Sequence, residues 1–263
     1  MPKFSANLTM LFTDVDFLDR FARAAKAGFK GVECQFPYQW PKEEIAERLA
    51  KNGLEMVLHN LPAGNFAAGE RGIACLPGRE GEFQEGVGKA IEYAKALSCP
   101  RLNCLVGLTP KDVPAQKVRQ TLVNNLRFAA TALGKEGIPL LVEALNKYDF
   151  PGFYLVYTQD VLQLFGEVNH PNLRLQYDIY HMQVMEGNLT KTIRDNVNRI
   201  AHIQFADNPG RHEPGTGEIN FPNLFRFIDE SGYTGWIGCE YKPAGVTEEG
   251  LKWAKSYLKG GKK

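Results

Sequence analysis

The fold is decided by a short stretch in the second half of the chain, Leu173-Arg174-Leu175-Gln176-Tyr177-Asp178. Its alternation of apolar and polar residues predicts a β-strand, and the strand ends on a carboxylate. Three further apolar runs also end on a residue with a side-chain oxygen, at 139–143, 201–204 and 236–240. If the four strands are parallel neighbours, their last residues meet at one end of the sheet. These residues are Glu143, Asp178, Gln204 and Glu240.

The rest of the chain supplies more units in which a short apolar strand precedes a helical segment. We expect the earlier strands at 4–7, 31–36, 54–59 and 101–106. We expect helices at 16–27, 41–52, 80–97, 114–135, 158–168, 190–197, 221–230 and 247–257. Eight such units predict an α/β fold, a closed (β/α)₈ TIM barrel rather than an open doubly wound sheet. No Gly-x-Gly-x-x-Gly phosphate turn or P-loop argues for the open sheet.

Length and composition fit one catalytic domain that spans residues 1–263. The length is close to the ~250 residues of a typical barrel of this kind. With 31 basic and 30 acidic residues, the chain has no net field to attract nucleic acid or an anionic membrane. It has no signal-peptide core or membrane-length apolar run, and its five cysteines lack Cys-x-x-Cys spacing. We therefore expect a cytoplasmic protein.

Strand periodicity predicts a partly polar barrel interior. In 173–178, the residues in phase with Leu173 face the helices, so Arg174, Gln176 and Asp178 point to the barrel axis. The same spacing places His202 inward, one layer below the mouth. There we expect a hydrogen-bonded core histidine rather than a ligand.

The four oxygen-bearing residues indicate a site for a hard divalent cation, Mg²⁺ or Mn²⁺. A single carboxylate at a strand end, such as Asp178, is as often a helix cap or half of an ion pair. Four consecutive strands with the same feature are harder to explain in that way. Buried carboxylates need a cation or hydrogen-bond donors, because desolvating them without compensation is costly. The sequence therefore predicts a metal site at the mouth.

Several motifs along nearly the whole chain carry a family resemblance. They are Phe4-Ser5-Ala6-Asn7-Leu8, His59-Asn60-Leu61-Pro62-Ala63-Gly64, Gly69-Glu70-Arg71-Gly72, Pro77-Gly78-Arg79, Tyr177-Asp178-Ile179-Tyr180-His181-Met182-Gln183, Pro214-Gly215-Thr216-Gly217-Glu218-Ile219-Asn220 and Gly238-Cys239-Glu240-Tyr241. Together they resemble the hydroxypyruvate isomerases of the xylose-isomerase-like barrel superfamily, which also contains ketose 3-epimerases and 2-oxo-tetronate isomerases.

The resemblance implies a divalent metal held by Glu143, Asp178, Gln204 and Glu240. It also implies that Glu143 and Glu240 are the catalytic proton-transfer pair. The chain departs from the epimerase pattern at Gln204, where those enzymes carry a metal-binding histidine. Because an amide oxygen binds more weakly than imidazole or carboxylate, we expect the metal to be held loosely.

The implied reaction interconverts hydroxypyruvate and tartronate semialdehyde through an enediolate. A metal at the carbonyl and hydroxyl oxygens spreads the developing charge, and a carboxylate moves the proton between neighbouring carbons. The expected partner is a small anionic hydroxy-keto acid, not nucleic acid or a membrane. A homo-oligomer remains open.

An anionic substrate also needs cationic or hydrogen-bonding groups around the mouth. The candidates are His59, Arg71, His181, Arg211 and Lys242. His59 ends its strand in phase with Val57, and the resemblance places it in the pocket. Arg211 matches by position a substrate-contacting arginine of the epimerases, and Arg71 has the geometry for a bidentate carboxylate clamp. The alternative for each cation is a solvated loop charge.

Three alternative functions compete with this interpretation. The nearest is a 2-oxo-tetronate isomerase, or a ketose or sugar-acid isomerase or epimerase with the same metal site. The second is a metal-dependent DNA-repair endonuclease of the related barrel family, which five scattered histidines and a near-zero net charge argue against. The third is a catalytically idle barrel, which the intact glutamate pair with Asp178 and His181 argues against.

Overall fold

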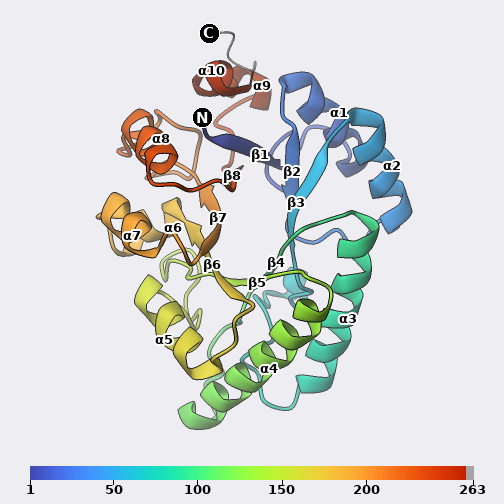
Figure 1. Ribbon diagram of the computed structural model, residues 1–263, viewed down its shortest axis with the longest axis vertical. Coiled ribbons are helices and arrows are strands. Elements are labelled where there is room, and N and C mark those ends of the chain that lie inside the picture. Colours follow the sequence, from blue (N-terminus) through green and yellow to red (C-terminus); the bar gives the residue numbers. More distant parts are fainter. Residues whose placement is uncertain (259–263) are drawn as a thin grey trace.

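A closed barrel of eight parallel strands forms the centre of the computed structural model, which describes residues 1–258 (Figure 1). The strands are β1 (Lys3–Asn7), β2 (Gly31–Cys34), β3 (Glu55–Asn60), β4 (Leu102–Cys104), β5 (Leu140–Val142), β6 (Leu173–Asp178), β7 (Ile200–Phe205) and β8 (Trp236–Cys239). They pair in chain order, and β1 closes the ring by pairing with β8. The predicted (β/α)₈ barrel is confirmed.

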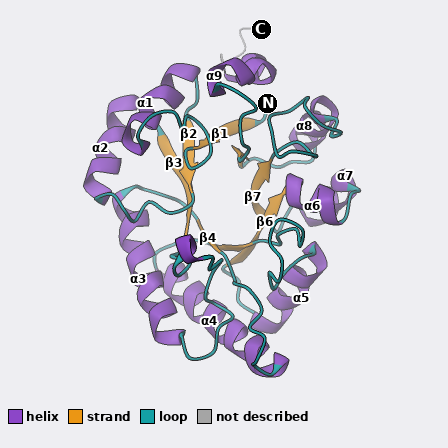
Figure 2. Ribbon diagram, turned by 180° about the vertical axis from the view of Figure 1, so that it is seen from behind, coloured by secondary structure: helices purple, strands orange, loops and turns teal. Residues whose placement is uncertain are grey.

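Helices surround the barrel on its outer side (Figure 2). They are α1 (Phe17–Ala27), α2 (Lys42–Asn52), α3 (Glu80–Ala96), α4 (Ala115–Lys135), α5 (Thr158–Val168), α6 (Ile179–Met185), α7 (Leu189–Asn196), α8 (Phe221–Glu230), α9 (Thr247–Gly250) and α10 (Lys255–Leu258), with 3₁₀ turns η1 (Phe66–Ala68) and η2 (Leu251–Ala254). None of the described helices has the length and hydropathy needed to cross a bilayer. The end of the expected domain, residues 259–263, lies outside the described residues.

Most helices lie within a residue or two of their predicted positions, with two exceptions. The last predicted helix, 247–257, is divided into α9, η2 and α10. Helix α6 was not predicted, because it starts directly at the end of β6 without a connecting loop. Its first turn is capped by the side chain of Asp178, which accepts hydrogen bonds from the backbone N–H groups of Tyr180 and His181.

The apolar core lies mainly between the strands and the helices. Around β1, the ring of Phe4 packs edge-on against Phe225 of α8 and Trp253 of η2, with centroids 4.9 and 5.1 Å away. Each fully buried aromatic ring of this kind stabilises the fold by roughly 1.5–3 kcal/mol. These contacts fix the outer faces of the strands and leave the inner faces for the site.

The inner faces follow the predicted periodicity except at an irregularity between β2 and β3. The register shifts after Val32, so that Glu33 pairs with Leu58 and Cys34 pairs with His59. Val57 and Leu58 then both pack inside the barrel with Leu141. A bulge of this type reverses the faces of the residues that follow.

His59 therefore does not share a face with Val57, and that prediction is wrong. The imidazole is fully buried, and its Nδ1 lies 3.2 Å from the hydroxyl of Tyr38. Tyr38 in turn packs edge-on against Tyr93 of α3, so His59 lies on the helix side of β3. The inward position at this strand end belongs to Asn60, whose side chain accepts a hydrogen bond from Asn103 across the barrel interior.

Candidate active site

The four residues predicted as metal ligands lie at the carboxyl ends of β5, β6, β7 and β8. Glu143 and Glu240 directly follow β5 and β8, while Asp178 and Gln204 are paired in register. Their exposed fractions are only 2 to 6%. The structure thus brings all four to the same buried end of the barrel, as the strand pattern predicted.

The carboxylates of this group lie close enough to perturb one another. Burial, followed by the charges of Glu240 and Asp178, raises the pKa of Glu143 well above its usual value. Burial and then Glu240 raise the pKa of Asp178 to about 7, although Arg211 opposes this shift. Groups with such shifted pKa values are suited to proton transfer near neutral pH.

Arg211 supplies positive charge to this carboxylate group. Its Nη2 donates a hydrogen bond to Oε2 of Glu240 at 2.8 Å and lies 4.0 Å from Oδ2 of Asp178. The residue has a left-handed backbone with a φ of 58°, which is uncommon for a residue other than glycine. Such strain is retained where surrounding contacts enforce it, often at functional sites.

The backbone of the loop that carries Arg211 is held in place by the side chain of Asp207. The carboxylate of Asp207 is fully buried and accepts hydrogen bonds from five backbone N–H groups of the loop. The donors are Asn208, Gly215, Thr216, Gly217 and Ile219. The loop is folded tightly around this one side chain, and that fold holds the Arg211 guanidinium over the mouth.

His181 lies in the first turn of α6, beside Asp178. Its Nδ1 accepts hydrogen bonds from the backbone N–H of Asn146, at 3.2 Å, and from the Asn146 side chain, at 2.8 Å. Burial and the charge of Arg211 lower the pKa of His181 well below its usual value, so the ring is neutral. Its proton therefore lies on Nε2, which is 3.6 Å from Oδ2 of Asp178. This tautomer presents an N–H donor at the mouth.

Carboxamides from the first half of the barrel hold the two glutamates. Oε1 of Glu240 accepts hydrogen bonds from Asn7, at 3.2 Å, and from Gln35, at 3.1 Å. Oε1 of Glu143 accepts one from Asn103 at 2.7 Å. The sequence interpretation missed these residues because it followed side-chain oxygens at strand ends only in the second half of the chain. Asn7 is the last residue of β1, so the same search extended to the first half would have found it, whereas Asn103 lies in the middle of β4.

Three predicted substrate-binding residues do not join this group. His59 faces the helices, as described above. The guanidinium of Arg71 donates to the backbone carbonyls of Phe66 and Glu70 in its own loop, and it lies 4.1 Å from the centre of the Phe66 ring. The side chain of Lys242 is exposed, and its backbone N–H donates to the carbonyl of Arg211. Lys242 thus contacts the site through its backbone.

No group of three or more His, Cys, Asp or Glu residues within 1–258 has the arrangement of a metal site. The reason is that the ligand oxygens are turned toward protein donors. Oε2 of Glu240 binds Arg211, and Oε1 of Gln204 accepts a hydrogen bond from Gln176 at 2.7 Å. Nevertheless one guanidinium, that of Arg211, lies beside the buried carboxylates of Asp178 and Glu240, and burial with neighbouring negative charge raises the pKa values of Glu143 and Asp178. A hard divalent cation fits this oxygen-rich set once these donors move aside.

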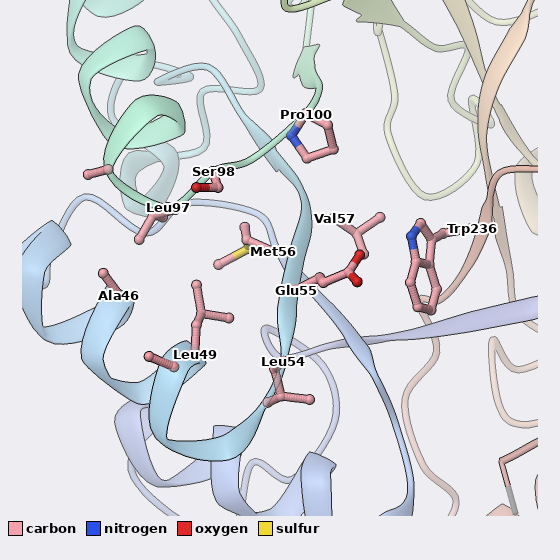
Figure 3. A pocket seen from close by; sticks show the side chains of 12 residues that line it. Ala46, Leu49, Leu54, Glu55, Met56, Val57, Leu97, Ser98, Pro100 and Trp236 are labelled. Atoms are coloured by element: carbon pink, nitrogen blue, oxygen red, sulfur yellow. The ribbon is translucent and has the colours of Figure 1, made fainter. Parts of the chain in front are cut away.

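A separate hollow of about 500 Å³ lies at the other end of the barrel (Figure 3). It lies between the ends of α2 and α3 and the first residues of β3, and Trp236 forms one wall. Its lining is mostly apolar, with Leu49, Leu54 and Met56 among the side chains shown. Glu55 is the one charged residue among those that line it, so the hollow has no group of neighbouring carboxylates like that of the mouth.

Comparison with known proteins shows the family to which this barrel belongs. A family model described as xylose isomerase-like TIM barrel matches residues 21–257. A crystal structure described as AP endonuclease, family 2, from Brucella melitensis superposes with a TM-score of 0.95 at 45% identity. That match covers 98% of this chain and 99% of the Brucella chain.

Two curated relatives extend over almost their whole lengths. The hydroxypyruvate isomerase of Escherichia coli strain K12 is 56% identical over 257 residues, which cover 98% of this chain and 100% of the relative. The 2-oxo-tetronate isomerase of Pectobacterium atrosepticum is 46% identical over 258 residues, which cover 98% of each. Both relatives are named as isomerases.

Proposed function

This chain belongs to the xylose isomerase-like TIM barrel family, and we propose that it interconverts hydroxypyruvate and tartronate semialdehyde. It is an isomerase, as its relatives are. The observation that carries the substrate assignment is the 56% identity with the Escherichia coli hydroxypyruvate isomerase, without a terminal region left unmatched in that relative. The buried carboxylate group at the barrel mouth supports the chemistry.

The reaction moves a proton from the hydroxymethyl carbon of hydroxypyruvate to the former carbonyl carbon. Removal of that proton leaves an enediolate, which is reprotonated one carbon away. We assign the two transfers jointly to Glu143 and Glu240. Glu143 suits this role because burial and neighbouring charge raise its pKa toward the pH at which an acid and a base are both accessible.

Arg211 and His181 have the chemistry to bind and orient the anionic substrate. The Nε of Arg211 is buried and has no hydrogen-bond partner within residues 1–258, so it is available as a donor. The Nε2 proton of His181 is suited to an oxygen that gains negative charge in the enediolate. Because His181 is neutral, it donates without releasing its proton, and Asn146 keeps it in that tautomer.

Glu143, Asp178, Gln204 and Glu240 would hold the divalent cation, and Mg²⁺ and Mn²⁺ are the proposed ions. When bound, such an ion supplies Lewis-acid stabilisation to the negative charge that develops on the substrate oxygens. Around it, burial of the mouth limits access of water to the enediolate. The proposed substrate is a small free metabolite, and we propose that the enzyme acts on it in the cytoplasm.

The decisive experiment is a coupled assay with hydroxypyruvate, 2-oxo-tetronates and free ketoses as competing substrates. We expect hydroxypyruvate to give the highest kcat/KM, and we expect a chelator to remove activity that Mg²⁺ or Mn²⁺ restores. Full activity after exhaustive chelation would contradict the metal assignment. Absence of turnover with hydroxypyruvate, in the presence of both ions, would contradict the substrate assignment.

The second candidate is a 2-oxo-tetronate isomerase, favoured by the 46% identity with the Pectobacterium enzyme. The proton transfer is the same, and the substrate is one carbon longer. A higher kcat/KM with a 2-oxo-tetronate than with hydroxypyruvate would establish this alternative.

The description of the Brucella structure raises the endonuclease class again. Two features of this chain argue against a DNA substrate. Its net charge is only +1, so it has no strong positive field to attract a phosphate backbone. In addition, His59 and His202 are turned to Tyr38 and Glu33, so only His181 among the buried histidines contacts a proposed ligand.

A further inference from the structure

Glu33 of β2 is a fully buried carboxylate that neither the strand pattern nor the proposed chemistry uses. It accepts four side-chain hydrogen bonds inside the barrel, one layer below the mouth. The donors are Ser5 at 2.8 Å, Asn7 at 3.2 Å, His202 at 2.9 Å and Gln204 at 2.7 Å. One of these donors is the weakest of the four proposed ligands.

The bond from Gln204 fixes which end of its amide faces which way. A glutamine amide carries an NH₂ group, which only donates, and an oxygen, which only accepts. Nε2 of Gln204 donates to Glu33, so Oε1 is directed away from Glu33 and accepts from Gln176 at 2.7 Å. With the amide reversed, two oxygens would meet at Glu33, and the NH₂ group, which cannot bind a cation, would take the place of Oε1.

We propose that Glu33 is a positioning residue that makes Gln204 an oxygen ligand by holding its NH₂ group away from the metal. This inference rests on the proposed metal site at the mouth. A carboxylate is suited to the task because it has no proton to donate and therefore accepts only one orientation of the amide. A glutamine at position 33 would accept either orientation.

The surroundings of Glu33 are built to keep a carboxylate at this depth. His202 and Ser5 hold its Oε2, and Asn7 shares its Oε1 with Gln204, so no lone charge is left without donors. Room is provided by Gly238 of β8, where an added Cβ would collide with both carboxylate oxygens of Glu33. The same Asn7 also donates to Glu240, which joins this network to the mouth.

The test is titration of the metal-free full-length protein with Mn²⁺, followed by calorimetry and by electron paramagnetic resonance of the bound ion. Glu33→Gln should weaken Mn²⁺ binding about 10-fold, the lower end of the usual scale for partners that orient metal ligands. Ser5→Ala is the matched control, because it removes one hydrogen bond from the same carboxylate without contacting Gln204. It should change the affinity much less than Glu33→Gln does, because Gln204 keeps its acceptor on Glu33.

A reciprocal exchange separates orientation from loss of structure. In the double variant Glu33→Gln with Gln204→Glu, the new amide at 33 donates to the new carboxylate at 204, which presents an oxygen whichever way it turns. Mn²⁺ affinity should return to the wild-type range or exceed it. If Glu33→Gln does not fold, Glu33→Asp takes its place, since the shorter side chain withdraws the acceptor from Gln204 and should also weaken binding.

Failure of the inference and failure of the metal site give different results. Wild-type affinity in a folded Glu33→Gln or Glu33→Asp variant, or no recovery in the folded double variant, overturns the role of Glu33 alone. Absence of Mn²⁺ binding by the wild-type protein overturns the metal site and this inference together. The coupled assay then still decides whether hydroxypyruvate is isomerised.

Discussion

The two halves of the barrel mouth differ in the charge of the side chains that they contribute. Strands β5 to β8 end on the proposed ligands, three of which are carboxylates. Strands β1 to β4 contribute neutral donors, such as Asn7 and Asn103, which hold the glutamates of the other half. One half thus carries the reactive charge, and the other half orients it.

The difference has a physical reason. A lysine or arginine from β1 to β4 would pair with a carboxylate and cancel the charge that attracts a divalent cation. A carboxamide fixes the position of the carboxylate while leaving its charge intact, and it satisfies one lone pair in a dry site. Arg211 comes from a loop instead, so its pairing with Glu240 can be exchanged without disturbing a strand. We therefore expect substitutions in the second half to have large effects on catalysis and metal binding, and substitutions in the first half to have smaller effects.

The largest effect is expected for Glu143→Gln and Glu240→Gln. Each change keeps the shape of the side chain and an oxygen ligand but removes the group that carries the proton. The kcat for hydroxypyruvate should fall by roughly 10²-fold or more, the usual scale for loss of general acid–base catalysis. KM should change less. A folded variant that retains wild-type kcat would contradict the proton-transfer roles.

The next largest effect is expected on metal affinity, where a charged and a neutral ligand of the second half are compared. Asp178→Asn removes a charged ligand but keeps the side-chain cap of α6, because asparagine also accepts the N–H groups of Tyr180 and His181. Gln204→Ala removes a neutral ligand. Because charge-assisted contacts are about twice as strong as neutral ones, we expect losses of about 100-fold and about 10-fold. Equal Mn²⁺ affinities by calorimetry for wild type and both variants would disprove a shared site.

The strand pattern was sufficient to predict the barrel and the second half of its mouth. Apolar runs that end on Glu143 or Asp178 carry a direct signal, because a buried carboxylate needs an explanation. The prediction of His202 as a hydrogen-bonded core histidine is also confirmed, since its Nε2 lies 2.9 Å from Glu33. These features depend on local periodicity and on the chemistry of single residues.

The first half could not be predicted in the same way. The register shift between β2 and β3 turns His59 outward and Asn60 inward, and a bulge leaves no mark on the alternation of one strand. The partner of Glu33 at Gln204 lies 171 residues away in the sequence. Asn103 lies inside β4 rather than at its end, so it has no distinctive signal until Glu143 is placed beside it.

The outward turn of His59 leads to a prediction about stability and pH. Burial lowers the pKa of His59 to about 4, below the value of about 6.5 in an unfolded chain. The unfolded state therefore binds more protons between these values, and stability falls as the pH falls through this range. Between pH 6.5 and 5 the contribution is about 2 kcal/mol, at 1.36 kcal/mol for each pKa unit.

His59→Gln removes this titration while keeping a donor and an acceptor near Tyr38. Urea unfolding at pH 7 and pH 5 should show that the wild type loses about 2 kcal/mol more than the variant over this interval. Other groups that titrate in this range affect both proteins equally. Equal losses of stability in both proteins would mean that His59 is exposed to water, as a residue of the barrel mouth would be. The outward position of His59 on β3 would then be wrong.

The smallest effect is expected for Asn103→Ala, which tests whether the first half orients rather than reacts. Asn103 is fully buried and donates to Glu143 at 2.7 Å, and this bond opposes the upward shift of the Glu143 pKa. Its loss should raise that pKa further, so the acid limb of the kcat/KM profile should move to higher pH, because the base must be ionised. At the optimum, kcat should fall about tenfold, equivalent to one hydrogen bond to a charged group. The matched control is Asn125→Ala in α4, another buried asparagine, whose side chain donates to the carbonyl of Ala74. It should lower stability without moving the pH profile, whereas an unmoved profile in Asn103→Ala itself would show that the carboxamide half of the mouth has only a structural role.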